Sequence, residues 1–252
     1  MRPATDSLPP ILGSWARALI DVFYPRNCIL TGEPLADSRY RYLSDVAVRR
    51  LPRIHDPRCP TCGHPYYGDI ETAPACHHCE NLQPAFKTGR CGYLFKRDIR
   101  IILHSLKYRK RTYLARDIAL LLADAPGFLD FLSGAVLVPV PLHPTKLRKR
   151  GFNQTAEILR HLKGYSPTPL TINPLLHRQI NTESQTRASR SERLKRVRGA
   201  FGISETAVLP PLDTRCIVFD DVFTTGATLN TCSHALRTAG FKNIDVAAFA
   251  HG

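Results

Sequence analysis

Short apolar runs alternate along the chain with segments in which apolar residues recur every three or four positions. The runs are typical of strands buried on both faces of a sheet, and they lie at 92–95, 135–141, 216–219 and 244–250. Helical spacing follows them, at 98–106, 114–122, 155–159 and 229–236. Strands that alternate with helices predict an α/β fold in which a parallel sheet is flanked by helices.

The first 24 residues contain a helical pattern, with apolar side chains that recur from Ile11 through Trp15 to Phe23. We expect an amphipathic helix that packs on the body of the protein. Binding to a membrane surface is the alternative, although the polar face of this helix is not notably basic.

Residues 25–91 form a segment of a different kind, with many prolines, glycines and cysteines. Two Cys-x-x-Cys pairs lie within it, Cys59 with Cys62 and Cys76 with Cys79. Pairs at this separation place four thiolates around one tetrahedral Zn²⁺, and so short a segment needs a metal in order to fold. We predict a structural zinc site at these four cysteines; a disulfide or a redox pair is the alternative.

Another cysteine, Cys28, begins a sequence that looks like a zinc knuckle whose second cysteine has been replaced by Thr31. A lone cysteine is more often a small buried hydrophobic residue than a ligand, so we do not predict a second zinc site. The nearby residues that are candidates for extra or substitute ligands are His55, His64, His77, His78 and Cys91.

A chain of 252 residues, 43% of them hydrophobic, is long enough for one large and one small domain. No apolar run approaches the ~18 residues that a membrane span needs, and the prolines and charges near the N-terminus do not fit a secretory signal. We therefore expect a cytoplasmic protein with no membrane span, whose cysteines are reduced or metal-bound. Its predicted parts are a helix within 1–24, a zinc-binding module at 25–91 and a sheet domain at 92–252.

The net charge of +14 is concentrated in residues 107–198. A ligand with several phosphates would suit this charge, and nucleic acid is also a candidate because the excess is larger than one small ligand needs. A solvated basic surface is the alternative. Within this region, the cluster at 107–111 is either a solvated helix junction or a loop that faces an anion.

The apolar run at 216–219 is followed by two carboxylates, a loop of small residues and a helix. Such a loop lets backbone N–H groups converge on an anion at the positive end of the helix, and its threonines add hydroxyl donors. Asp220 and Asp221 would repel a phosphate, but they suit the hydroxyls of a ribose or a Mg²⁺ reached through water. Threonines that merely cap the helix are the alternative.

Four cations follow the run at 135–141, within a predicted loop over 142–154. Ligands of an open α/β sheet bind at the carboxyl ends of its strands, so this loop and the acidic segment can form two halves of one site. The polar segment 173–201 carries a helix-like basic run at 187–198. We expect a flap over the site there, with a disordered linker as the alternative.

The phosphate loop is neither a Walker loop nor a dinucleotide-binding loop, because the glycine and lysine spacing of both is missing. Over Ile217–Thr228 it resembles the 5-phosphoribosyl-1-pyrophosphate (PRPP) loop of type I phosphoribosyltransferases. With its other motifs, the chain resembles the ComF family, the competence protein F-like members of that superfamily. These motifs are Phe23-Tyr24-Pro25, the four paired cysteines, Leu106-Lys107-Tyr108, Val138-Pro139-Val140-Pro141, Arg150-Gly151-Phe152-Asn153-Gln154, and Thr182-x-x-Gln185 with Arg193.

The resemblance implies a type I phosphoribosyltransferase-like domain that binds PRPP with Mg²⁺, preceded by a four-cysteine zinc-binding module, in proteins linked to DNA uptake during natural transformation. By the same resemblance, Asp220 and Asp221 would hold the ribose hydroxyls. The 5-phosphate would be held by Thr224, Thr225, Gly226, Ala227 and Thr228. The segment from Pro141 to Arg150 would meet the pyrophosphate and its Mg²⁺. The residues predicted to bind the pyrophosphate itself are Lys107, Arg148, Lys149 and Arg150. Thr31 departs from the pattern, since many relatives have a second cysteine there.

Two functions are compatible with these features. The first is a phosphoribosyltransferase, in which cations stabilise the departing pyrophosphate and a closing flap excludes water, although no base-recognition element is evident. The second is a non-catalytic accessory protein that binds single-stranded DNA and keeps the PRPP fold as a scaffold or sensor. Its stacking candidates are Tyr108, Tyr113 and Phe152. Other DNA-uptake proteins are candidate partners in either case.

Overall fold

The computed structural model describes residues 26–35, 38–66, 76, 78–79, 82–179 and 199–252. These residues belong to two compact units, one that ends at Arg50 and one that covers Leu51–Gly252. The helix predicted within 1–24 and the basic run predicted at 187–198 lie outside the described residues. The division of the chain after residues 24 and 91 stays a prediction.

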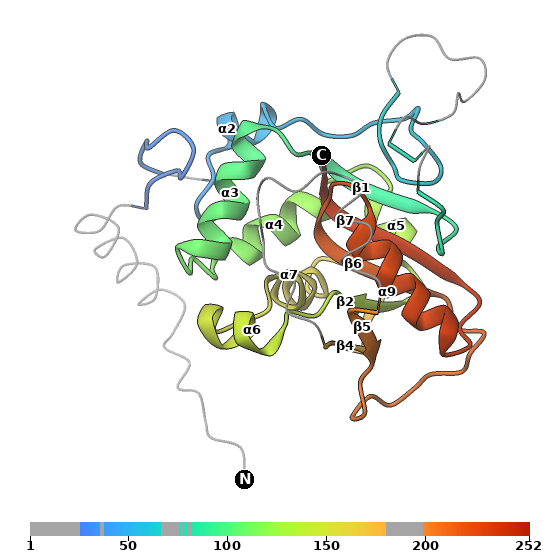
Figure 1. Cartoon of the computed structure of the whole chain (residues 1–252). Helices are drawn as coiled ribbons and strands as arrows, with labels where there is room; N and C mark the ends of the chain where they lie inside the picture. The colour runs from blue at the N-terminus through green and yellow to red at the C-terminus, as the bar shows by residue number, and fades with distance from the viewer. Residues whose placement is uncertain (1–25, 36–37, 67–75, 77, 80–81, 180–198) are drawn as a thin grey trace. The chain divides into compact units, whose positions relative to one another are not determined.

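The second unit is built on a five-stranded sheet in which every neighbouring pair of strands is parallel (Figure 1). In spatial order the strands are β1 (Gly89–Leu94), β7 (Ile244–His251), β6 (Cys216–Phe223), β2 (Val136–Pro139) and β3 (Thr171–Ile172). All eight residues of β7 are buried, as expected of a strand covered on both faces. The predicted α/β class with a parallel sheet is thereby confirmed.

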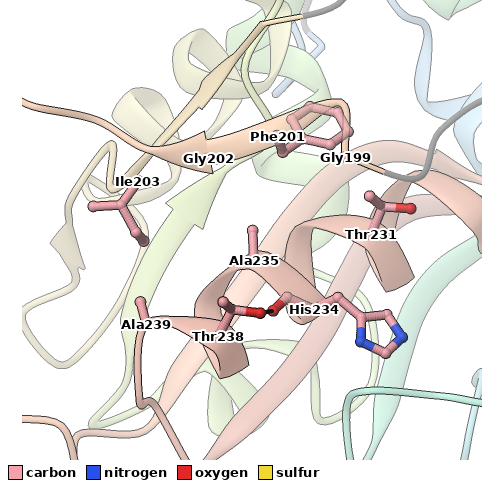
Figure 2. Close-up of a pocket in the computed structure, with 9 residues that line it drawn as sticks. All are labelled: Gly199, Phe201, Gly202, Ile203, Thr231, His234, Ala235, Thr238 and Ala239. Atoms are coloured by element: carbon pink, nitrogen blue, oxygen red, sulfur yellow. Dashed lines mark hydrogen bonds between the residues drawn. The ribbon is translucent and has the colours of Figure 1, made fainter.

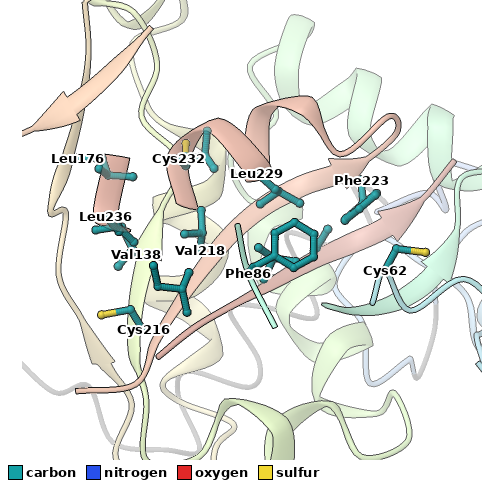
Figure 3. Packing of buried hydrophobic residues seen from close by; sticks show 14 of the residues in the cluster. Cys62, Phe86, Val138, Leu176, Cys216, Val218, Phe223, Leu229, Cys232 and Leu236 are labelled. Carbon is teal, nitrogen blue, oxygen red and sulfur yellow. The ribbon is translucent and has the colours of Figure 1, made fainter. Parts of the chain in front are cut away.

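Helices cover both faces of this sheet, α9 on one side and α4 and α7 on the other (Figure 1). The helices among the described residues of this unit are α3 (Arg97–Tyr108), α4 (Leu114–Ala123), α5 (Phe128–Leu132), α6 (Pro144–Arg150), α7 (Gln154–Leu162) and α9 (Ala227–Thr238). Val138 and Val218 pack with Leu236 of α9 in one buried cluster (Figure 3). The intervening Leu137 and Ile217 are also fully buried, and they point to the opposite face because side chains alternate along a strand.

Two boundaries differ from the sequence prediction. The segment after the second strand was predicted as a loop, but residues 144–150 form helix α6. Proline at the first helical position favours this helix, as does His143, whose Nδ1 accepts a hydrogen bond from the backbone N–H of Thr145 at 3.3 Å. Strand β6 also runs past the acidic pair to Phe223, because its ladder with β7 continues to the pairing of Phe223 with His251.

A short antiparallel pair lies beside the main sheet and has no counterpart in the sequence prediction. It joins β4 (Leu176–Arg178) to β5 (Phe201–Ile203). Its strands have only three residues each, too few for a periodic pattern to show. Strand β4 lies within the segment 173–201 predicted as a flap, β5 begins at the last residue of that segment, and β5 contacts α9.

In the first unit, residues 27–34 adopt the backbone of a zinc knuckle. The N–H of Cys28 donates to the carbonyl of Glu33, and the N–H of Gly32 donates to the carbonyl of Cys28, both at 2.8 Å. Cys59 makes the same two bonds, with His64 and Gly63, at the same lengths. The shape of the knuckle is therefore kept at Cys28, although Thr31 stands where a second thiolate would lie. Helix α2 (Asp45–Arg49) follows, capped by Ser44.

Among the described residues, no helix combines the length and the hydropathy needed to cross a membrane.

Candidate functional site

The acidic pair on β6 lies within a network that joins four elements. Asp221 is 4% exposed and forms an ion pair with Lys107 of α3. Its other carboxylate oxygen accepts a hydrogen bond from Nε2 of Gln154, on α7, at 3.2 Å. Arg150, at the end of α6, donates in turn to the side-chain oxygen of Gln154. Of the predicted cations, Lys107 thus contacts Asp221 directly, and Arg150 is linked to Asp221 through Gln154.

The two carboxylates have opposite electrostatic states. Burial by itself would raise the pKa of Asp221, but Lys107 and hydrogen bonds outweigh it and hold that pKa below its usual value. Burial, together with the neighbouring charge of Asp221, raises the pKa of Asp220 well above its usual value. Burial opposes the charge of Lys107, yet the two carboxylates keep the pKa of this lysine raised. The network therefore contains one stable ion pair and one carboxyl that holds its proton readily.

The loop after β6 brings small residues to the N-terminus of α9. Gly226 is the residue just before the helix and has φ +73°. A Cβ at this position would lie 2.8 Å from atoms of Leu82 and of Phe223, so the loop packs closely here. Thr224 is exposed, whereas Thr225 and Thr228 are half-buried. The first N–H groups of a helix have no intrahelical acceptors, so this loop can receive an anion.

The remaining predicted cations differ in their surroundings. Arg148 and Lys149 are exposed on α6. Arg150 is half-buried, and its guanidinium lies 5.8 Å from the ring centre of Tyr108. Tyr108 is itself 64% exposed. Lys107 and Arg150 are thus close to the acidic pair, while the structure shows no link between that pair and Arg148 or Lys149 among the described residues.

Gln154 is the residue of this network that sequence reasoning missed. The sequence shows it only as the last residue of the Arg150–Gln154 motif, for which no role of this glutamine is predicted. The available signal was its place at the start of a helix that follows a core strand, where ligands of an α/β sheet bind. Its bond to Asp221 depends on two segments far apart in the chain, which a single sequence does not place together.

The four paired cysteines converge as the zinc prediction requires. The sulfurs of Cys59 and Cys79 are 3.8 Å apart, and those of Cys62 and Cys76 are 3.7 Å apart. Sulfurs about 2.3 Å from a tetrahedral Zn²⁺ are separated by about 3.8 Å, so the spacing fits one metal ion. A disulfide would bring two sulfurs to about 2.0 Å, and all four cysteines are free thiols. The donor set therefore suits a structural metal ion.

A separate pocket of ≈ 330 Å³ lies between β5 and α9 (Figure 2). Phe201 and Ile203 line it from β5, while Thr231, His234 and Thr238 line it from α9. None of the described residues that line it was predicted as a site residue. The signal that could have indicated it is the recurrence of these three polar residues on one face of the helix.

Comparison with known proteins places these features in context. No protein-family model matches the chain. Competence protein F of Haemophilus influenzae is 28% identical over 197 residues, which are 74% of this chain and 82% of that protein. Competence protein ComFC of Bacillus subtilis is 26% identical and shares 79% of each chain. The predicted resemblance to the ComF family is confirmed.

Relatives of this ComF-like chain also include DNA utilization protein YhgH of Salmonella typhimurium. It is 27% identical over 229 residues, which cover 88% of this chain and 95% of that protein. Among solved structures, a hypoxanthine phosphoribosyltransferase from Staphylococcus aureus is 15% identical, with a TM-score of 0.30. The match covers 52% of this chain and 60% of that protein. Such a TM-score is too low to support the fold assignment, which rests on the strand order and the motifs.

Proposed function

We propose that this protein binds PRPP with Mg²⁺ at the carboxyl end of β6. The observation that carries the proposal is the continuity of three features: the acidic pair, the close-packed loop at Gly226 and the N-terminus of α9. The helix end suits the 5-phosphate, because its N–H groups and its dipole both favour an anion. The neighbouring carboxylates suit the two ribose hydroxyls, which are hydrogen-bond donors.

The cations near the acidic pair are suited to bind the pyrophosphate group of PRPP. Lys107 is held beside Asp221 and has three N–H donors, so it can keep the ion pair and also contact a pyrophosphate oxygen. Arg150 reaches the network through Gln154. Mg²⁺ would arrive with PRPP and neutralise part of its charge. Transfer of the phosphoribosyl group would in addition require an acceptor, so we propose binding and leave catalysis to the test below.

The names of the relatives connect this proposal with DNA. Competence protein F, ComFC and the DNA utilization protein YhgH are named for the uptake or use of DNA. We therefore propose a role of this chain in the same process, with PRPP as its small-molecule ligand.

Direct binding of single-stranded DNA is the second candidate function, and a specific surface favours it. Tyr108 is 64% exposed, and Arg150 lies over its ring. Arg109 and Lys110, which follow Tyr108, are exposed as well. An exposed aromatic ring among cations is the arrangement on which unpaired bases stack.

The experiment is a calorimetric titration of the protein with PRPP and Mg²⁺, repeated with the Asp220→Asn/Asp221→Asn variant. We expect binding by the natural sequence and no binding by the variant, with the zinc content of both unchanged. Equal affinity in the two proteins would show that the ribose site is elsewhere. Release of pyrophosphate in the same sample would identify an enzyme, and its absence would leave a PRPP-binding protein.

A further inference from the structure

Three histidines meet beside the cysteine site, although they come from three separate segments. His64 follows the first cysteine pair, His78 lies within the second, and His251 is the last residue of β7. One ring nitrogen from each lies within 4.8 Å of those of the other two. The ring centres of His64 and His78 are 4.0 Å apart, and that of His251 lies 4.9 Å and 5.1 Å from them.

His251 is the member of this cluster that most needs a ligand. Its side chain is fully buried, at 0% exposure. Among the described residues, neither of its ring nitrogens has a hydrogen-bond partner. A buried polar group without a partner is unfavourable, and such groups in native proteins call for a specific cause. Phe223 stacks on this ring, with the two ring centres 4.8 Å apart.

The donor set restricts what the ligand can be. A neutral imidazole can donate one N–H to an anion but brings no formal positive charge to hold it, and a hard cation such as Mg²⁺ or Ca²⁺ would need oxygen ligands. Three imidazoles without a carboxylate are the donors that Zn²⁺ and similar transition-metal ions prefer. The cluster found in the described residues contains three histidines and no carboxylate.

We propose that His64, His78 and His251 bind a second transition-metal ion, Zn²⁺ or an ion of similar preference, separate from the ion of the four cysteines. Nitrogens at about 2.1 Å from a tetrahedral Zn²⁺ are about 3.4 Å apart. The ring nitrogens now lie within 4.8 Å of one another, so small side-chain rotations would bring them to the metal-binding distance. The main change would be the separation of the stacked rings of His64 and His78. Three protein ligands leave the fourth position of the ion for water or an anionic oxygen.

The histidine cluster lies next to the start of the predicted phosphate loop. His251 pairs with Phe223 across the β6–β7 ladder, and the N–H of Gly252 donates to the carbonyl of Phe223 at 2.8 Å. Phe223 directly precedes Thr224, the first residue of the predicted phosphate loop. A metal ion here would fix two segments of the cysteine module to the end of the sheet beside that loop. The inference does not depend on PRPP binding.

Metal content tests the proposal. The purified protein is saturated with Zn²⁺, freed of excess ions by gel filtration and analysed for zinc per chain. We expect two equivalents for the natural sequence and one for His64→Asn/His78→Asn. His55→Asn is the matched control, because His55 is exposed, lies in the same segment and is outside the cluster, and it should retain two equivalents.

A second variant guards against misfolding. His251→Phe replaces the buried ring by an apolar ring of similar shape, and it should also bind one equivalent. Titration with Co²⁺ reports on the cysteine site separately, because only thiolate ligands give the sulfur-to-cobalt charge-transfer band. This band should persist in both variants. One equivalent in the natural sequence, or two in either variant, would overturn the proposal.

Discussion

At Gly226, backbone conformation and packing both disfavour a side chain. Its φ of +73° is unfavourable for any residue with a Cβ, and a Cβ would lie 2.8 Å from Leu82 and Phe223. We expect Gly226→Ala to lower the free energy of unfolding by about 2–4 kcal/mol, measured by urea denaturation. PRPP affinity should fall as well, because the loop would have to move.

The matched control for this change is Gly127→Ala. Gly127 has a similar φ of +64°, but nothing lies within 4 Å of the Cβ that it would gain. In this variant the free energy of unfolding should fall by only about 1–2 kcal/mol, the cost of the left-handed backbone conformation. Equal losses in the two variants would contradict the close packing inferred at the phosphate loop.

The two carboxylates of the site should affect stability in opposite directions. Asp220 has a raised pKa in the folded protein, so its contribution is complete below the unfolded value of about 3.9 and is lost as pH rises through the folded pKa. Asp220→Asn should therefore raise the free energy of unfolding at pH 7, by on the order of 1 kcal/mol, and have little effect near pH 3.5. Chemical denaturation at the two pH values measures this difference.

Asp221→Asn is the informative partner of that variant. Asp221 has a lowered pKa, so its contribution is present above about 3.9 and is lost as pH falls through the folded value. Its removal leaves Lys107 without its ion pair in a mostly buried place, which should cost about 1–3 kcal/mol at pH 7. If Asp220→Asn were as destabilising as Asp221→Asn, the assignment of the proton to Asp220 would be wrong.

Individual site residues could be predicted from the sequence where a short local motif contains all of them. The four cysteines belong to two local pairs, and they do meet. The bond between Gln154 and Asp221 and the approach of His251 to His64 were missed, because each joins residues that only the tertiary fold brings together. The roles predicted for Asp220, Asp221 and the cations remain predictions.

At the scale of elements, the end of α3 and the end of α6 form one basic surface around the exposed Tyr108. If single-stranded DNA binds there, each phosphate contact contributes about 0.7 to the dependence of log affinity on log salt concentration. Arg109→Gln/Lys110→Gln should reduce that slope by about 1.4 and weaken binding at low salt. Fluorescence anisotropy with a labelled oligonucleotide at several salt concentrations measures both quantities.

Lys242→Gln is the control for this surface. Lys242 is exposed and precedes β7, so it lies at the amino end of the sheet, away from the carboxyl ends where the candidate site lies. Its removal should leave the slope nearly unchanged. A salt slope that is the same in all three proteins would exclude α3 and α6 as the DNA-binding surface.

Elements with a clear apolar pattern were predicted well, and elements without one were not. Strands β2, β6 and β7 and helices α3, α4, α7 and α9 lie where apolar spacing indicated them. Helix α6 was missed because its seven residues bury none of their side chains, so it has no apolar periodicity to detect. Its signals were the proline at 144 and the glycine at 151, which mark a start and an end.

At the scale of the whole molecule, metal ions should matter more to stability than any single side chain. The first cysteine pair packs on the sheet so closely that a Cβ on Gly89 would lie 2.6 Å from the carbonyl oxygen of Thr61. Loss of the metal would release this contact with β1. We expect a zinc chelator to lower the melting temperature by about 10 °C or more, with recovery on addition of Zn²⁺ but not of Mg²⁺. An unchanged melting temperature after complete zinc removal would contradict a structural metal site.

The central claim is that the acidic strand end, the loop at Gly226 and the start of α9 form one PRPP site. A crystal structure of the protein with PRPP and Mg²⁺ tests it most directly. We predict the 5-phosphate within hydrogen-bond distance of the backbone N–H groups of residues 225–228, and the ribose hydroxyls on Asp220 and Asp221. PRPP bound instead in the pocket between β5 and α9, or absent at saturating concentration, would contradict it.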